Sequence, residues 1–440
     1  MRQVQRFGSS QPYAVVPAKA GTQCRLTTLD SRVRGDDKPL VARKLWAAAV
    51  LITLGTLAAP AQAKLNSCDG PILLGTTISE TGPFSTLADR WRKMTEVFAE
   101  EVNKSGGVAV KSCNKKLPIK FVIYDDQSVP ATAVQLYEKM ATVDNVDFFV
   151  GPDWSSIGGP VPPVAEKHGI PMVMANVATP ALYDRGFKYV WGTPYPVVPR
   201  WSERYFEMIS KVNPKPQSIF FITHDNPVMK GITGVWSKKA EAQGLKVLGN
   251  ETFSPELKDF TALISKVRAA KPDIVYISSF DNASVPLVQQ MRQLKVRAMD
   301  VHHTMLTGAL NRQVGADVEG MTGELSWYPG VKGDYSDLVE AVMKRSDVTM
   351  FDYIWTLGRL TSYLAMMQAI EKAGAVDRDK VKDALYKATI KAPAGDVTFD
   401  ERGFPNTGAF TIQMQGGKVN VVWPLDVATG KLIWPSPTWQ

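Results

Sequence analysis

The chain is poor in the residue types on which catalytic and metal sites depend. Its 440 residues include only three cysteines and four histidines. It contains no Gly-x-x-x-x-Gly-Lys-Ser/Thr phosphate loop, no Gly-x-Ser-x-Gly elbow and no His-Glu-x-x-His pair, which argues against the enzyme classes built on them. His302 and His303 are adjacent, so in a strand they point to opposite faces and do not suit a shared metal. The sequence predicts no enzyme, no metal site and no cofactor.

Long apolar runs are also scarce, and the clearest one lies near the start. Residues 45–59 form an apolar run of about fifteen residues, whereas a membrane span needs roughly twenty. Arg43 and Lys44 precede the run, and Pro60-Ala61-Gln62-Ala63 ends it. A basic start, a short apolar centre and an Ala-x-Ala end are typical of a secretory signal peptide. We therefore expect export and cleavage after Ala63. No cysteine follows at that point, which argues against a lipid anchor.

Net positive charge is concentrated in the leader, residues 1–63. This segment carries nine of the 51 Lys and Arg residues and three of the 43 Asp and Glu residues. The remainder holds 42 basic and 40 acidic residues, a net charge of only +2. No basic footprint for nucleic acid remains.

Cysteine usage agrees with export. Apart from Cys24 in the leader, the chain has Cys68 and Cys113, and each stands a few residues before an expected strand. If these strands are parallel neighbours, their amino ends lie within reach of a disulfide. An even pair in an oxidising compartment favours this bond.

The segment from Gly70 to Thr193 repeats a strand–loop–helix cycle. Strands are expected over 72–77, 119–124, 147–151 and 170–175, and helices over 87–102, 130–143 and 155–168. Polar turns follow the strands at Ser79, at 125–128, at 153–156 and at 176–179. Ligands of open parallel sheets bind just outside the carboxyl ends of the strands. The pattern therefore predicts a scaffold that binds a small polar molecule.

After Thr193 the same alternation starts again, followed by helices and then by short strands. Helices are expected over 199–212, 228–243, 258–270 and 285–294, and strands over 218–223, 246–253, 273–278 and 296–302. Residues 319–327 look extended, three helices are expected over 334–345, 351–374 and 378–389, and a meander over 396–399, 409–413 and 419–422. About 377 residues suit two domains. We expect two doubly wound α/β lobes, with chain crossings near Thr193, Gly323 and Gly395.

Several motifs together resemble the periplasmic leucine/isoleucine/valine-binding family. They lie at 75–84, 101–108, 124–128, 151–152, 163–166, 169–171 and 179–187. The resemblance covers essentially the whole chain after the leader and is strongest over 72–193. It implies a type I periplasmic binding fold with three hinge crossings. It places residues 64–193 and 323–394 in lobe 1, and residues 194–322 and 395–440 in lobe 2. It further implies a periplasmic monomer that delivers its ligand to an inner-membrane ABC permease.

In lobe 1 the resemblance assigns the ligand's carboxylate to the turn Trp154-Ser155-Ser156, with Ser155 or Ser156 as donor. Ser79 lies in the first turn of the same lobe. The second family turn falls on Asn176, Val177 and Ala178, with its threonine displaced to Thr179, so Asn176 is the expected polar contact. Ser155 and Ser156 are also suited to cap a helix, and Trp154 to ordinary packing.

In lobe 2 the match is weaker. The aromatic residue with which the family covers an amino-acid ligand aligns near Met229 or Lys230, so that match fails. The strand-end position that is often tyrosine in the family aligns near Phe280-Asp281. The family's acid for an α-ammonium aligns near His303, which cannot replace it at neutral pH. A buried ammonium without an acid costs on the order of several kcal/mol.

Two ligand classes remain open for this reason. Either Asp281 or Asp225 pairs with the ammonium of a hydrophobic amino acid, or the ligand is an aromatic or aliphatic carboxylate without an ammonium. His303 and Ser155, with a wall of Trp154, Phe280 and Tyr353, would suit the second class. Amides and urea are further alternatives, and a periplasmic sensor that signals to a receptor or regulator is an alternative to an importer component.

The leader generates a testable prediction. Residues 1–40 resemble a translated bacterial intergenic repeat, and the resemblance lies in segments 18–23 and 29–37. We therefore infer that the true start lies near Val41, read from a GTG codon. Amino-terminal sequencing of the precursor should find none of residues 1–40, and the exported protein should begin at Lys64. A precursor that carries residues 1–40 would contradict this inference.

Overall fold

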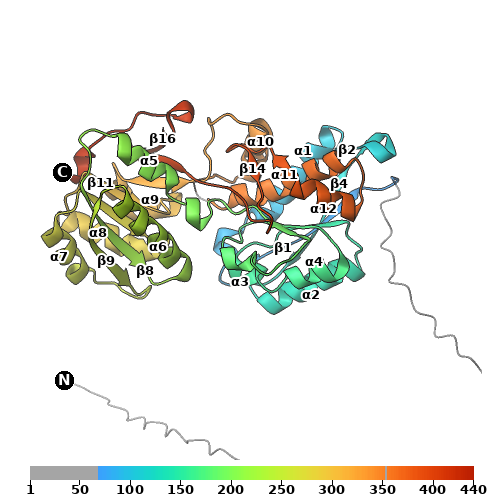
Figure 1. Ribbon diagram of the computed structural model, residues 1–440, viewed down its shortest axis with the longest axis horizontal. Coiled ribbons are helices and arrows are strands. Elements are labelled where there is room, and N and C mark those ends of the chain that lie inside the picture. Colours follow the sequence, from blue (N-terminus) through green and yellow to red (C-terminus); the bar gives the residue numbers. More distant parts are fainter. Residues whose placement is uncertain (1–67, 352–353) are drawn as a thin grey trace, which may run out of the picture. The chain divides into compact units, whose positions relative to one another are not determined.

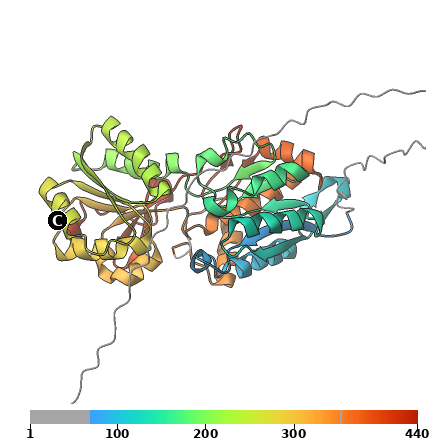
Figure 2. The ribbon, with the colours of Figure 1, turned by 90° about the horizontal axis from the view of Figure 1, so that it is seen from below.

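The computed structural model describes residues 68–351 and 354–440 (Figure 1). The predicted signal peptide, its cleavage point and Tyr353 lie outside the described residues, and the side chain of Asp281 is not described either. Each of the two predicted lobes contains its own β-sheet. Figures 1 and 2 show helices on both faces of each sheet, which is the doubly wound arrangement expected from the sequence.

The sheet of lobe 1 is fully parallel, with strand order β4-β1-β5-β6-β7. Its strands are β1 (Ile72–Ile78), β4 (Ile119–Asp125), β5 (Phe148–Val150), β6 (Met172–Met174) and β7 (Val190–Gly192). Residues of β5 and β6 are completely buried, as expected for parallel strands covered on both faces. All carboxyl ends of these strands therefore meet at one edge.

Helices from two separate parts of the chain cover the sheet of lobe 1. The first part supplies α1 (Trp91–Lys104), α2 (Pro130–Thr142), α3 (Ser155–Gly158) and α4 (Pro162–His168), and the second supplies α10 (Ser336–Ser346), α11 (Thr356–Ala373) and α12 (Arg378–Tyr386). Helix α11 is buried on nearly all sides and contacts β5 and β6. Two short hairpins complete the lobe, namely β2 (Val108–Val110) with β3 (Lys115–Leu117), and β13 (Thr389–Ile390) with β14 (Val397–Thr398).

The sheet of lobe 2 has seven strands in the order β16-β15-β12-β11-β10-β8-β9. The parallel part consists of β8 (Ser218–His224), β9 (Lys246–Phe253), β10 (Ile274–Ser278), β11 (Asp300–His303) and β12 (Thr322–Leu325), and the antiparallel part of β15 (Phe410–Gln415) and β16 (Lys418–Trp423). The helices are α5 (Glu203–Lys211), α6 (Pro227–Ala242), α7 (Thr261–Ala270), α8 (Asp281–Gln293) and α9 (Gly308–Val314).

The pairing of the strands locates the three crossings between the lobes. The first lies between β7 and α5. Strand β12 pairs with β15 over its whole length and with β11 at Thr322 and Gly323. The second crossing therefore follows Leu325, slightly later than the expected position near Gly323. Strand β14 pairs with β13, next to α11, so the third crossing follows Thr398 rather than Gly395.

Some local expectations were wrong. The single helix expected over 155–168 is divided into α3 and α4, because Pro160, Pro162 and Pro163 lack the amide hydrogens that a continuous helix needs. The expected meander is also divided, since β14 belongs to another hairpin than β15 and β16. Helix α9 was not predicted.

The structure forms the expected disulfide between Cys68 and Cys113, whose Cα atoms are 5.6 Å apart. The reason given from the sequence holds, because β1 and β4 pair in parallel and Ile72 lies opposite Ile119. The bond therefore ties the start of the described chain to the turn between β2 and β3, shortly before the edge strand β4.

A buried acid lies in the core of lobe 2, on the first residue of β11. Asp300 is fully buried, and its Oδ2 accepts hydrogen bonds from Thr322 Oγ1 at 2.6 Å and from Tyr205 OH at 2.9 Å. Its Oδ1 has no partner among the described residues. Burial raises the pKa of Asp300 to about 6, and these two hydrogen bonds limit the rise. The lobe therefore bears a cost for this charge at neutral pH.

We predict that Asp300→Asn stabilises the protein at pH 7.5 but not at pH 4. The folded pKa lies above the unfolded value, so ionisation destabilises the fold as the pH rises from about 4 to about 6 and the cost stays constant above that range. A shift of about two pKa units corresponds to about 3 kcal/mol, and part of this is lost because the new amide lacks an acceptor. Thermal unfolding at both pH values measures the effect. The exposed Glu241→Gln is the control, and a lower melting temperature of Asp300→Asn at pH 7.5 would contradict the assignment.

Candidate functional site

Three adjacent strands of lobe 1 place polar residues at one edge of the sheet. Ser79 follows β1, Asp153 follows β5 and Asn176 follows β6. All three side chains are at most 3% exposed. The sequence prediction that these turns come together is confirmed, because the three strands are parallel neighbours. Ser79 donates to Asp126 Oδ1 at 2.6 Å, so its hydroxyl helps to hold the turn after β4.

An arginine of helix α11 occupies the centre of this edge. Arg359 is fully buried and forms an ion pair with Asp153. Its guanidinium also donates to the carbonyl oxygen of Thr77 at 2.8 Å and to Tyr363 OH at 2.7 Å. Asn176 Nδ2 donates to the other carboxylate oxygen of Asp153 at 2.6 Å. One buried network therefore links α11 to the ends of β1, β5 and β6.

Arg359 and Asp153 each stabilise the charge of the other in the buried interior. Burial disfavours the charge of Arg359, but the attraction of Asp153 and the hydrogen bond to Tyr363 outweigh it, so the pKa of Arg359 is raised. Burial raises the pKa of Asp153, and Arg359 and Asn176 counteract this rise. We describe the pair as charged, because each partner supplies the compensating charge that the other needs in a low-dielectric interior.

A glycine allows α11 to come this close to the sheet edge. A Cβ atom on Gly358 would lie 2.1 Å from Asn176 Oδ1 and 2.7 Å from the carbonyl oxygen of Thr193. A side chain at this position would thus push the helix away. Gly358 therefore sets the position from which the next residue, Arg359, reaches Asp153.

Trp154 builds an aromatic wall next to this network. Its ring stacks between Phe84 at 5.2 Å and Trp91 at 5.4 Å, and it meets Trp355 edge-on at 6.1 Å. Trp355 in turn meets Trp201 at 5.9 Å. The backbone of Trp154 has φ of 63°, which is uncommon for a large residue. Its indole Nε1 is buried and has no hydrogen-bond partner among residues 68–351 and 354–440. Trp154 is only 8% exposed. Its ring therefore packs in the interior of lobe 1 as well as forming part of the aromatic wall.

Ser155 and Ser156 have free hydroxyls. Ser155 is partly exposed and Ser156 is exposed, and no hydrogen bond within the described chain engages either side chain. Neither hydroxyl caps the short helix α3, whose N-cap position is Trp154. Ala178 is 5% exposed and Thr179 is partly exposed, at the end of the neighbouring turn. These residues remain available at the edge for a ligand.

In lobe 2 the residues expected to bind ligand also follow adjacent strands. Asp225 follows β8, Phe280 follows β10 and His303 ends β11. Asp225 is 53% exposed and forms an ion pair with Lys230 at 2.5 Å. Phe280 is partly exposed and meets His224 edge-on at 5.8 Å. The structure thus brings these three residues to one edge of the second sheet.

The expected role of His303 is not supported. Its ring is fully buried, Nδ1 accepts from the Met305 amide at 3.0 Å, and Nε2 lies 2.7 Å from Ser284 Oγ. Burial lowers the pKa of His303 to about 3, so the ring is neutral. A neutral ring that accepts at Nδ1 carries its proton on Nε2 and donates it to Ser284. Both nitrogens are therefore used within lobe 2, and His303 has no hydrogen left for a carboxylate.

Sequence reasoning missed the ion pair between Asp153 and Arg359. Asp153 stands in a predicted strand-end turn, but its partner is 206 residues later, in the helix predicted over 351–374, from which only Tyr353 was assigned to the site. A single arginine within that buried helix was the available signal, because arginine is rarely fully buried without a partner.

The parallel strands of each sheet end in a polar edge, and three crossings join the two lobes. This arrangement defines a two-lobed binding scaffold of the periplasmic type. The profile of the periplasmic binding protein family matches residues 71–418. The chain belongs to this family.

Known proteins support this assignment. The leucine-, isoleucine-, valine-, threonine- and alanine-binding protein of Pseudomonas aeruginosa is 28% identical over 343 residues, which cover 76% of this chain and 86% of that protein. A branched-chain amino acid transporter substrate-binding protein of Streptococcus pneumoniae, solved with isoleucine, aligns with a TM-score of 0.64 and 19% identity over 83% of this chain and 100% of that one.

A solute-binding protein of an ABC transporter from R. palustris, solved with benzoate, aligns with a TM-score of 0.62 and 17% identity over 84% of this chain and 97% of that one. At these identities the solved structures establish a shared fold. Among residues 68–351 and 354–440, no helix has the length and apolar character to cross a bilayer, and no group of His, Cys, Asp and Glu residues is arranged to hold a metal.

The buried pair generates a prediction about stability. Arg359→Met should destabilise the protein by about 3–5 kcal/mol, because it leaves Asp153 buried without a countercharge. Arg359→Met with Asp153→Asn should recover much of this loss, since no unpaired charge then remains. Denaturant unfolding of the single and double variants measures the coupling.

Arg345→Met is the matched control for this experiment. Arg345 forms exposed ion pairs with Glu100 and Glu101 at 2.5 and 2.6 Å, and such surface pairs contribute about 1 kcal/mol or less. Additive effects of Arg359→Met and Asp153→Asn would contradict a coupled buried pair.

Proposed function

We propose that this chain is the solute-binding component of an ABC importer of the branched-chain amino acid type, and that it binds a small apolar or aromatic carboxylate. The observation that carries the proposal is the pair of unengaged hydroxyls, Ser155 and Ser156, next to the aromatic wall around Trp154. Neutral hydroxyl donors bind a carboxylate, and the partly exposed Phe84 and Trp355, which contact Trp154 in this wall, offer apolar surface to an apolar body.

Neutral donors also suit the surrounding charge. Arg359 is already paired with Asp153 and hydrogen bonded to Thr77 and Tyr363, so its guanidinium is not available to a ligand. The ligand's negative charge would therefore be met by Ser155, by Ser156 and by the amide hydrogens at the start of α3, which have no partner within that helix.

The described acids at the two sheet edges favour a ligand without an ammonium group. Each of them already has partners: Asp125 accepts from Thr81, Asp126 from Thr77 and Ser79, Asp153 from Arg359 and Asn176, and Asp225 pairs with Lys230. An ammonium would have to break one of these contacts or pair with Asp281. The relative solved with benzoate carries a ligand of the class that we propose here.

The mechanism that we propose is lobe closure. Contacts of one ligand with both sheet edges stabilise the closed arrangement of the two lobes relative to the open one. An inner-membrane permease would then recognise the closed form. In this proposal the protein is a periplasmic monomer without catalytic activity, and its signal peptide is removed after Ala63.

The proposal predicts that Ser155→Ala combined with Ser156→Ala weakens carboxylate binding at least about tenfold, because one or two charge-assisted hydrogen bonds are lost. A thermal-shift screen of hydrophobic amino acids, aromatic acids, dicarboxylates, amides and urea first identifies a ligand, and titration calorimetry then compares the variants. Unchanged affinity would remove both serines from the site.

Asp281→Asn separates the two ligand classes. An aromatic acid should bind this variant as it binds the unaltered protein, because it has no ammonium to pair with Asp281. A hydrophobic amino acid that binds the unaltered protein and loses affinity in Asp281→Asn would show that the ligand carries an ammonium. Ser112→Ala, which removes an exposed hydroxyl next to the disulfide residue Cys113 and away from both strand-end edges, is a matched control for the serine variants.

A further inference from the structure

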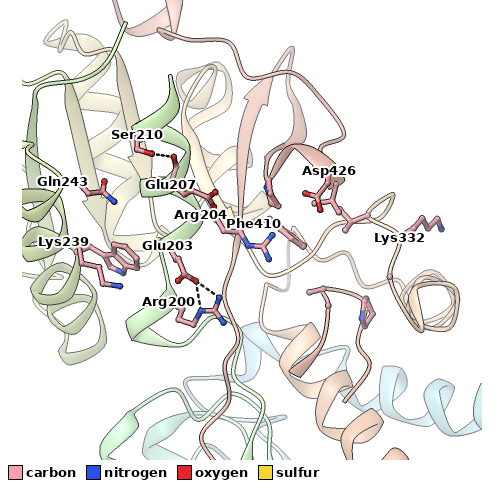
Figure 3. A pocket seen from close by; sticks show the side chains of 18 residues that line it. Arg200, Glu203, Arg204, Glu207, Ser210, Lys239, Gln243, Lys332, Phe410 and Asp426 are labelled. Atoms are coloured by element: carbon pink, nitrogen blue, oxygen red, sulfur yellow. Dashed lines mark hydrogen bonds and ion pairs between the residues drawn. The ribbon is translucent and has the colours of Figure 1, made fainter. Parts of the chain in front are cut away.

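A cavity lies apart from the strand-end edges. It has a volume of about 840 Å³. Its lining comes from α5 and α6 of lobe 2, from Phe410 at the start of β15, from residues 424–427, and from residues 331–333 and 393–395 (Figure 3). Residues 331–333 follow the second crossing, and residues 393–395 precede the third. The cavity therefore adjoins the segments that connect the lobes.

Most charged groups in this lining already have partners. Arg200 pairs with Glu203 at 2.6 Å, Glu207 pairs with Lys211 at 2.8 Å, and Lys332 pairs with Glu340 at 3.1 Å. Lys239 lies over the Trp236 ring at 4.3 Å and donates to the carbonyl oxygen of Pro199. These groups form the rim and require no further ligand.

Arg204 and Asp426 differ from this pattern. The Arg204 guanidinium lies 4.5 Å from the centre of the Phe410 ring, and within the described chain it has neither an ion pair nor a hydrogen bond. Asp426 is exposed and likewise has no such partner in that part of the chain. Figure 3 shows both side chains at the cavity, from α5 and from the segment after β16.

The environment of Arg204 disfavours an isolated charge. Partial burial, and then the neighbouring Arg200, lower the pKa of Arg204, whereas Asp426, Glu203 and Glu207 act in the opposite direction. Asp426 is thus close enough to attract Arg204 without contacting it. The space between one cation and one anion, beside the Phe410 and Trp236 rings, has the polarity of a site for a molecule that carries both charges.

We propose that this cavity binds a small zwitterion, whose carboxylate pairs with Arg204 and whose ammonium pairs with Asp426. A guanidinium binds a carboxylate through two parallel hydrogen bonds, and the carbon chain of the ligand packs against Phe410 and Trp236. The site is distinct from the edges that contain Ser155 and Asp225, and it does not rest on the ligand proposed for them.

Occupancy of this cavity is coupled to the crossings. Because residues 331–333 and 393–395 line it, a change in the crossings changes the cavity, and a bound zwitterion favours one arrangement of them.

The test compares 4-aminobutyrate with its two halves, butyrate and butylammonium, by titration calorimetry. The protein is the exported chain with Ser155→Ala and Ser156→Ala, so that binding at the lobe edges is weakened. We expect 4-aminobutyrate to bind at least tenfold more tightly than either half. Glycine, β-alanine and 5-aminovalerate then measure the preferred separation of the two charges. Equal affinities for 4-aminobutyrate and its halves would overturn the proposal.

Two substitutions assign the contacts. Arg204→Gln and Asp426→Asn should each weaken 4-aminobutyrate at least fivefold, and Arg204→Gln should leave butylammonium unaffected. Arg268→Gln, which removes an exposed arginine from α7, is the matched control and should change nothing. Asp426 is exposed, so its variant folds and tests the site even if Arg204→Gln does not. Unchanged affinity in Asp426→Asn would refute the proposed pairing, whatever the outcome for the strand-end ligand.

Discussion

The ion pair between Arg359 and Asp153 is the interaction on which the binding edge of lobe 1 depends. It joins a helix from the last third of the chain to strand ends from the first half, and Thr77 and Asn176 complete the same network. Burying two charges is costly, and an apolar pair of equal volume is often as stable. What the pair provides here is a fixed geometry: the turn that carries Trp154, Ser155 and Ser156 begins at Asp153. Lobe 1 consequently acquires its final binding edge only after the chain has traversed lobe 2 and returned.

The two lobes treat buried charge differently, and this difference bears on the ligand. Lobe 1 holds a compensated pair, whereas the equivalent edge of lobe 2 ends in His303, which burial keeps neutral and whose two nitrogens are engaged. Asp225 is exposed and paired with Lys230. Asp153 and Asp225 are thus each paired with a cation, and His303 is neutral. Such edges select ligands through neutral donors and apolar walls, and a ligand with a second charge would have to find its partner elsewhere.

The sequence was sufficient for the parts of the fold that depend on local periodicity. Strand β9 was predicted with its observed bounds, α2 and α6 to within one residue, and the parallel cycle implied that Ser79, Asp153 and Asn176 would share an edge. Pro160, Pro162 and Pro163 divide the segment after Ser156 into α3 and α4. These prolines were the signal in the sequence, and the prediction of one helix over 155–168 did not use it. The partners of Arg359 and His303 could not be predicted, because each contact depends on tertiary packing and the Arg359 contact joins residues 206 positions apart. The family resemblance assigned a ligand-binding position to His303 but did not predict that Ser284 and Met305 engage both nitrogens of its ring.

The second and third crossings leave and enter lobe 2 on neighbouring strands of one sheet. Leu325, the last residue of β12, lies opposite Phe410, the first residue of β15, in an antiparallel ladder. Two of the three connections are therefore joined to each other through the pairing of β12 with β15. In the lobe closure that we propose, these two connections would have to bend together. Phe410 also carries the Arg204 guanidinium on its ring, so the strand through which the chain re-enters lobe 2 begins at the lining of the cavity proposed to bind a zwitterion.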